Sequence, residues 1–185
     1  MRIRFQSRSG FTLIEILVVV VILGIASAIV IPQIGSRDDL NAATAARALM
    51  ADLIYAQNLA IAKQKSYYVR FYGESYSVCD SNALVPIDHP LKPALNGGKY
   101  IVTFGDQAVP TPSGVTPGLE RVSLKTPDFL GQTVLGFDEM GQPFSFDTST
   151  TTATTMTSAG TIQLQSGSTT LTISVQPFTG EATVQ

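Results

Sequence analysis

An acidic residue inside a long apolar segment is the feature that most constrains this chain. The run from Phe11 to Ile31 has 21 residues, and those not plainly apolar are Thr12, Glu15, Gly24 and Ser27. As a helix it is about 31 Å long at about 1.5 Å per residue, which matches the hydrocarbon core of a bilayer. A carboxylate at that depth costs roughly 2.5–3.5 kcal/mol on insertion scales. Because the run holds no basic residue, the partner of Glu15 must be created by processing or supplied by another chain.

The residues before this run set its expected orientation. Met1 to Gly10 contain three arginines and no acid, and basic residues stay on the cytoplasmic side of a membrane helix. The run is longer than the apolar core of a secretory signal, and the small-residue pair Ser9-Gly10 precedes it instead of following it. The sequence therefore predicts a single-pass anchor with a cytoplasmic amino terminus and residues 36–185 across the membrane.

The start of the run carries a family resemblance. The motif Gly10-Phe11-Thr12-Leu13-Ile14-Glu15, after a basic leader and before a long apolar run, resembles the cleavage and methylation signature of type IV pilins and type II secretion pseudopilins. The resemblance implies cleavage after Gly10 by a prepilin peptidase and N-methylation of the new Phe11 amine. It also implies a bacterial inner-membrane location with a periplasmic β domain, and a pairing of Glu15 with the Phe11 amine of a neighbouring subunit. That pairing would answer the charge problem. Pro32 matches the family's helix-weakening proline just past the run.

Composition indicates one modest globular domain beside the anchor. The chain has 185 residues and a formal net charge of −2, and loss of residues 1–10 leaves 9 basic residues beside 14 acidic ones. Nonspecific attraction to nucleic acid is therefore not expected. Lys125 is the last basic residue, so the C-terminal cations that a DNA-binding minor pilin would need for phosphate contact are absent from the sequence.

After Pro32 the apolar residues recur at three- and four-residue steps, which indicates an amphipathic helix. The apolar positions are Leu40, Ala43, Ala46, Leu49, Met50, Leu53, Ile54, Ala56, Ala60 and Ile61. We expect one long helix from Phe11 to about Lys65, kinked near Pro32; the sequence leaves open whether Ile34–Arg37 break it or only bend it. Residues 11–32 would lie in the membrane or in a filament core, and residues 33–65 would lay an apolar stripe on the globular domain.

Residues 66–185 are typical of a β-rich domain. A hairpin is expected at 67–79 around Gly73-Glu74, and further strands at 99–104, 121–124, 133–137, 143–146, 160–165, 170–175 and 182–184. Turns are expected at 138–141, 165–168 and 178–180. The segments 109–118 and 148–158 read as loops, the second either flexible or decorated with glycans. The predicted class is α+β, with a long amino-terminal helix packed on an antiparallel sheet or β-sandwich, as in pilins.

The part beyond the anchor resembles the GspH/FimT-type minor pseudopilins. Asp52-Leu53, Ala56-Gln57 and Ala60-Ile61 fit the "dL…AR…AI" helix pattern of that group, with Gln57 where arginine is common. Residues 137–143 and 172–184 resemble its turn and its last pair of strands.

No catalytic, cofactor or metal site is predicted. The one histidine, His89, lies in an expected loop, and a metal site would need two or three His or Cys ligands at fixed spacing. No nucleophile elbow, P-loop or dinucleotide motif is present. The one cysteine, Cys79, is expected to be a small buried residue of a strand. The aromatic group Tyr67, Tyr68, Phe71, Tyr72 and Tyr76 is expected to pack in the core rather than to stack on nucleic acid.

Three functions are compatible with these sequence features. The first is a structural minor pseudopilin that assists protein export in a type II secretion pseudopilus, with a prepilin peptidase and other pilin-like subunits as partners and no small-molecule substrate. The second is a minor pilin of a type IV pilus, serving adhesion, motility or DNA uptake. The third is a membrane-anchored enzyme, which the lack of a catalytic constellation disfavours.

Overall fold

The computed structural model of the chain describes residues 11–34, 38–88, 98–105, 115–116 and 118–185. Two compact units divide after residue 37. The first contains helix α1 (Leu13–Ile34), which continues two residues past Pro32, and the second opens with helix α2 (Asp38–Lys63). Pro32, near which a kink is predicted, lies in the last turn of α1, and the predicted break or bend at Ile34–Arg37 reaches residues 35–37, which lie outside the described residues. Among the described residues, no helix has the combination of length and hydropathy needed to cross a bilayer.

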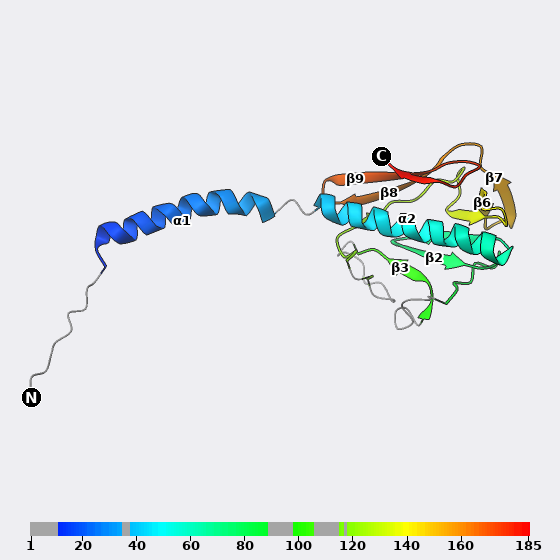
Figure 1. Cartoon of the computed structure of the whole chain (residues 1–185), viewed down its shortest axis with the longest axis horizontal. Helices are drawn as coiled ribbons and strands as arrows, with labels where there is room; N and C mark the ends of the chain where they lie inside the picture. The colour runs from blue at the N-terminus through cyan, green and yellow to red at the C-terminus, as the bar shows by residue number, and fades with distance from the viewer. Residues whose placement is uncertain (1–10, 35–37, 89–97, 106–114, 117) are drawn as a thin grey trace, which may run out of the picture. The chain divides into compact units, whose positions relative to one another are not determined.

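The second unit contains two antiparallel sheets (Figure 1). Six strands form the first, in the order β3-β2-β1-β5-β6-β7, and four form the second, in the order β10-β9-β8-β4. The strands are β1 (Tyr67–Tyr72), β2 (Ser75–Cys79), β3 (Ile101–Thr103), β4 (Ser123–Leu124), β5 (Val134–Phe137), β6 (Pro143–Asp147), β7 (Thr152–Thr155), β8 (Gly160–Ser166), β9 (Thr169–Val175) and β10 (Ala182–Val184). The predicted α+β class, a helix on antiparallel sheets, is confirmed.

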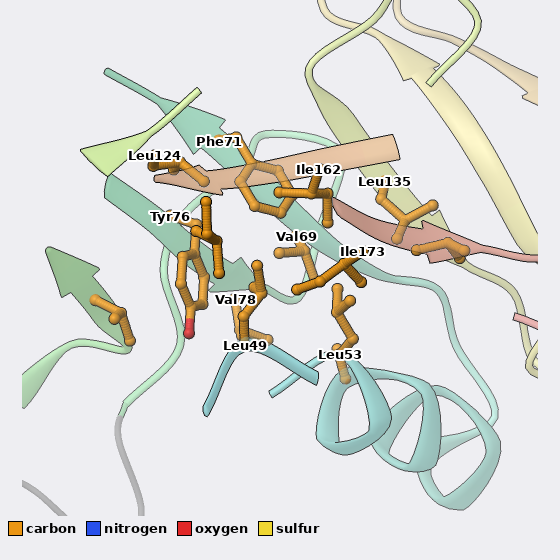
Figure 2. Packing of buried hydrophobic residues seen from close by; sticks show 14 of the residues in the cluster. Leu49, Leu53, Val69, Phe71, Tyr76, Val78, Leu124, Leu135, Ile162 and Ile173 are labelled. Atoms are coloured by element: carbon orange, nitrogen blue, oxygen red, sulfur yellow. The ribbon is translucent and has the colours of Figure 1, made fainter. Parts of the chain in front are cut away.

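Helix α2 lies against strands of both sheets, including β1 and β9. Its buried face consists mostly of alanines, whose short side chains let the helix backbone approach closely; these are Ala42, Ala45, Ala46, Ala56 and Ala60. Leu49 and Leu53 are the two large side chains on this face, and each is at most 1% exposed. Figure 2 shows Leu53 below Ile173 and Leu49 next to Val78, so one core joins the helix to both sheets.

Two polar side chains of α2 also reach the sheets. Asp52 accepts hydrogen bonds from the hydroxyls of Tyr76, at 2.5 Å, and Tyr100, at 2.8 Å. The Gln57 amide donates to the carbonyls of Gly141 and Thr179, both at 2.8 Å. These carbonyls belong to the β5–β6 and β9–β10 turns, so Gln57, at the position where the resembling family often has arginine, ties two turns to the helix.

Close packing around Gln57 depends on glycine. Gly141 has φ +81°, and a Cβ there would lie 2.8 Å from Ile61 Cδ1. Gly180 has φ +69°, and a Cβ there would lie 2.8 Å from Gln57 Nε2. Both conformations are ones that L side chains adopt rarely, so glycine is favoured at both turn positions.

Most of the predicted strands are confirmed, with small shifts at their ends. The hairpin around Gly73-Glu74 forms with Tyr72 opposite Ser75. The prediction for 148–158 is wrong in part, because Thr152–Thr155 form β7, an edge strand paired with β6. All four β7 side chains are exposed, so the segment lacks the apolar alternation by which a strand is recognised.

The predicted apolar stripe of α2 is also wrong in part. Leu40, Ile54 and Ile61 are 68%, 49% and 44% exposed, whereas Ala42 and Ala45, which were not assigned to the stripe, are fully buried. The buried face is therefore rotated toward the small residues. Four of the aromatic residues of β1 and β2 are buried as predicted: Tyr67, Tyr68, Phe71 and Tyr76. The prediction is wrong for Tyr72, which is 40% exposed.

The core packing of α2 gives a first prediction. Leu53→Ala should lower the free energy of unfolding by about 2–5 kcal/mol, because it removes a fully buried side chain between helix and sheets. Leu40→Ala is the matched control on the exposed side of the same helix, and it should change this free energy by less than about 0.5 kcal/mol. Urea unfolding of the full chain in detergent, followed by tyrosine fluorescence, measures both. Equal losses would contradict the orientation of α2.

The tyrosines bound to Asp52 give a second prediction. Burial, and then the Asp52 charge, raise the pKa of Tyr76 well above 10 and also raise the pKa of Tyr100. In the unfolded chain a tyrosine hydroxyl has a pKa near 10. The raised pKa values of Tyr76 and Tyr100 therefore stabilise the folded chain fully below that pH, and this stabilisation is lost as pH rises toward their pKa values in the folded chain. Asp52→Asn should move the tyrosinate absorbance of these residues to lower pH, whereas the exposed control Asp128→Asn should not. An unchanged alkaline titration in Asp52→Asn would refute the contact.

Candidate processing and assembly site

The beginning of α1 has a defined hydrogen-bond arrangement. The Glu15 backbone N–H donates to Thr12 Oγ1 at 3.3 Å, and the Thr12 backbone N–H donates to Glu15 Oε2 at 3.5 Å. This reciprocal pattern is a capping box, which satisfies two backbone donors at the start of a helix. Sequence analysis missed this local role, although the Thr-x-x-Glu spacing that signals it is present. Both bonds are longer than the roughly 2.7–3.2 Å that is usual for N–H···O bonds, so the carboxylate is only loosely held.

The large apolar side chains of α1 from Leu13 to Ile25 are all exposed. From Leu13 to Ile25 the large apolar side chains are 47–84% exposed, and Phe11 is 78% exposed. A helix that is apolar all round is stable in water only when something covers it, either lipid or other helices. The first unit therefore presents a surface that requires a partner.

The structure places the predicted site residues as follows. Gly10 lies outside the described residues, Phe11 lies two residues before α1, Glu15 lies in its first turn, and Pro32 lies near its end. The ion pairs described, Lys65–Asp80 and Lys99–Asp88, both belong to the second unit. Within the described residues, Glu15 thus has its contact with Thr12 and no cation beside it.

The candidate catalytic or metal-binding residues have structural roles where the structure describes them. Cys79 is fully buried in β2, as predicted, and burial raises the pKa of its thiol. Asp138 Oδ1 accepts the backbone N–H groups of Met140 and Gln142, which closes the β5–β6 turn. His89 lies outside the described residues. Within the described part of the chain, no group of three or more His, Cys, Asp or Glu side chains could hold a metal ion.

Comparison with known proteins agrees with the amino-terminal motif. Residues 6–31 match the model of the prokaryotic N-terminal methylation motif. A 42-residue stretch is 60% identical to type II secretion system core protein G of Pseudomonas aeruginosa and covers 23% of this chain. The matched stretch spans 30% of the length of that relative.

The fold was compared with solved structures as well. The crystal structure of the type IV minor pilin FimU from Pseudomonas aeruginosa aligns with 78% of this chain and 86% of its own, at a TM-score of 0.40 and 15% sequence identity. The methylation motif and the identity to core protein G support a type IV pilin-like protein.

Proposed function

We propose that this chain is a minor pseudopilin of the GspH/FimT type, assembled into a short type II secretion filament that assists protein export. The methylation motif at residues 6–31 is the observation that carries the proposal. It supports a prepilin peptidase as the first partner and other pilin-like subunits as the later ones. The role is structural rather than enzymatic, as expected for a pilin-like subunit.

The first unit supplies the physical basis of this role. Its outward-facing apolar side chains would be covered by lipid before assembly and by neighbouring helices afterwards. In the precursor, the run from Phe11 to Ile31 would anchor the chain in the inner membrane, with the second unit in the periplasm. Cleavage after Gly10 would then place a positive amine on Phe11, four residues from Glu15.

The assignment to type II secretion draws support from the identity to core protein G. The methylation motif also resembles that of type IV pilins, so a minor pilin of a type IV pilus is the second candidate. Deletion of the gene distinguishes the two. Loss of secreted cargo with normal surface pili supports the pseudopilin, and loss of motility, adhesion or DNA uptake with normal secretion supports the pilin.

Maturation of the amino terminus is the first prediction from this proposal. Mass spectrometry of the protein from its host should find a chain that begins at N-methylated Phe11. In a strain without prepilin peptidase, the same chain should retain residues 1–10. Recovery of the uncleaved chain from cells with an active peptidase would contradict the proposal.

The charge of Glu15 gives the second prediction, and the capping box makes the test sharper. Glu15→Ala removes both the cap and the charge, whereas Glu15→Gln keeps a side chain that suits a capping box but has no charge. If Glu15 pairs with the Phe11 amine of a neighbour, both variants should be processed normally and both should enter filaments at least about tenfold less than the native chain, since the unpaired amine and the lost pair cost more than about 1.4 kcal/mol.

The control for this test is Thr12→Ala, which removes the hydroxyl of the cap and keeps the Glu15 charge. It should enter filaments at nearly the native level. Filament fractions from the membranes of each strain, quantified by immunoblot, give the comparison. Native incorporation of Glu15→Gln together with loss of Thr12→Ala would assign Glu15 to helix capping and overturn the pairing.

A further inference from the structure

One face of α2 carries large apolar side chains that the rest of the second unit leaves exposed. Leu40, Ile54 and Ile61 are 68%, 49% and 44% exposed. Together with Arg47, which is also exposed, they recur at intervals of seven residues. Seven residues make nearly two turns of an α-helix, so these four side chains form one line along the helix surface. We call Leu40, Arg47, Ile54 and Ile61 the heptad face of α2.

The positions between these side chains leave room for a partner. Thr44 and Ala51 are exposed and small, and the Thr44 hydroxyl donates to the Leu40 carbonyl at 2.8 Å. This hydroxyl therefore has its hydrogen bond within α2 and requires none from outside. Large side chains at seven-residue spacing, with small ones between them, form a surface that a second helix fits, because its own side chains enter the gaps.

Two turns add exposed apolar side chains beside the C-terminal half of this face. Met140 is 72% exposed, and its neighbour Gly141 lies against Ile61. Phe178 is 60% exposed and belongs to the β9–β10 turn that the Gln57 amide holds against the helix. Single exposed apolar residues are ordinary on a protein surface, whereas a group drawn from one helix and two turns favours a contact surface.

Arg47 gives the heptad face its one charge and restricts what can cover it. Within the described residues, Arg47 takes part in neither of the ion pairs. None of the residues three or four positions away on α2 is acidic; these are Ala43, Thr44, Met50 and Ala51. A partner that covers the apolar side chains on both sides of Arg47 removes water from its guanidinium group. That removal costs free energy unless a carboxylate lies opposite.

The acids of α2 do not supply such a carboxylate in a second copy of this chain. Each of the three contacts its own domain: Asp38 lies against Gly167, Asp39 accepts the Thr169 hydroxyl, and Asp52 accepts the hydroxyls of two tyrosines. The heptad face and the residues that border it, at 43–44, 50–51 and 57–58, include no Asp or Glu.

The register of a helix pair leads to the same result. In a parallel pair of α2 helices, Arg47 would face Arg47, and the two charges would repel each other. In an antiparallel pair centred on the heptad face, Arg47 would face Ile54 and would have no carboxylate opposite. The charge of this face therefore favours a helix from a different chain, which agrees with the role of a minor subunit.

We propose that the heptad face of α2 docks a helix of a different pilin-like subunit, which places a carboxylate opposite Arg47. Helix α1 ends at Ile34 and α2 begins at Asp38, so a neighbour that covers α1 is held at high local concentration near α2. The inference rests on the proposed function, because such a neighbour is present only if the chain enters a filament of several pilin-like subunits.

Photo-cross-linking of the full chain in its host tests this contact. Ile54→benzoylphenylalanine places a light-activated group in the middle of the heptad face, and irradiation should join it to another chain. Peptide mapping of the adduct should place the cross-link in a helix of a protein that carries a prepilin methylation motif, with an Asp or Glu in the mapped segment. Gln163→benzoylphenylalanine, at an exposed position of β8, is the matched control and should not give this adduct.

Charge exchange tests the role of Arg47 itself. Arg47→Glu in the Ile54→benzoylphenylalanine chain should lower the yield of the adduct about fivefold, as expected for loss of an ion pair and its replacement by repulsion. Changing the mapped acid of the partner to lysine should restore the yield. Arg70→Glu, the same reversal at an exposed position of β1, is the matched control and should leave the yield unchanged.

The outcomes separate this contact from the proposed function. If the chain is processed and enters filaments but gives no adduct from position 54, or if Arg47→Glu leaves the yield unchanged, the docking is wrong and the proposed function stands. An adduct with a second copy of this chain, with lipid or with an exported protein would also overturn the docking. A chain that is neither processed nor found in filaments would overturn both the function and the contact.

Discussion

Contact between one face of α2 and two sheets is the constraint on which the rest of the second unit depends. Alanines such as Ala45 and Ala56 bring the helix close, and Leu49 and Leu53 fill the space where both sheets meet it. The polar side chains of Asp52 and Gln57 would cost free energy if they were left without hydrogen-bond partners. Because their partners lie at fixed places in the sheets and turns, these bonds also favour one position of the helix along the sheets. The turns that pack against α2 are thereby held in fixed positions as well.

The two units differ in where their apolar side chains lie. In the second unit, apolar side chains turn inward, and polar groups on α2 find partners within the same chain. In the first unit, the large apolar side chains from Leu13 to Ile25 all face outward, and among the described residues the Glu15 carboxylate accepts one long bond, from the Thr12 backbone N–H. A helix surface of this kind can be covered by lipid or by other helices.

The sequence predicted much of this fold because strand alternation and turn residues are local signals. Strands such as Thr169–Val175 and the hairpin at Gly73 needed no knowledge of the tertiary structure. Thr152–Thr155 were missed because this strand exists by backbone pairing to β6 and buries no side chain. The buried face of α2 was misjudged because hydropathy ranks Ile54 above Ala45, whereas the sheets accept only the smaller residue. A cavity beside the β4–β8 pair is lined by Arg121, Ser123, Lys125, Gln165 and Gly167, and no local sequence pattern reveals that these residues lie together.

The β6–β7 hairpin has its own small hydrogen-bond network. Asp147 binds the hydroxyl and backbone N–H of Ser149, which lowers the pKa of its carboxyl to about 2, and Thr150 shares a hydrogen bond with Thr152. The side-chain bonds described in this turn thus stay within it, and its exposed threonines take no part in the core. A tip built this way can accept inserted residues without loosening α2, since exposed loop tips are where insertions are tolerated. Related chains could therefore vary in length here, and a peptide tag placed between Thr150 and Thr151 would leave both ends of the helix intact.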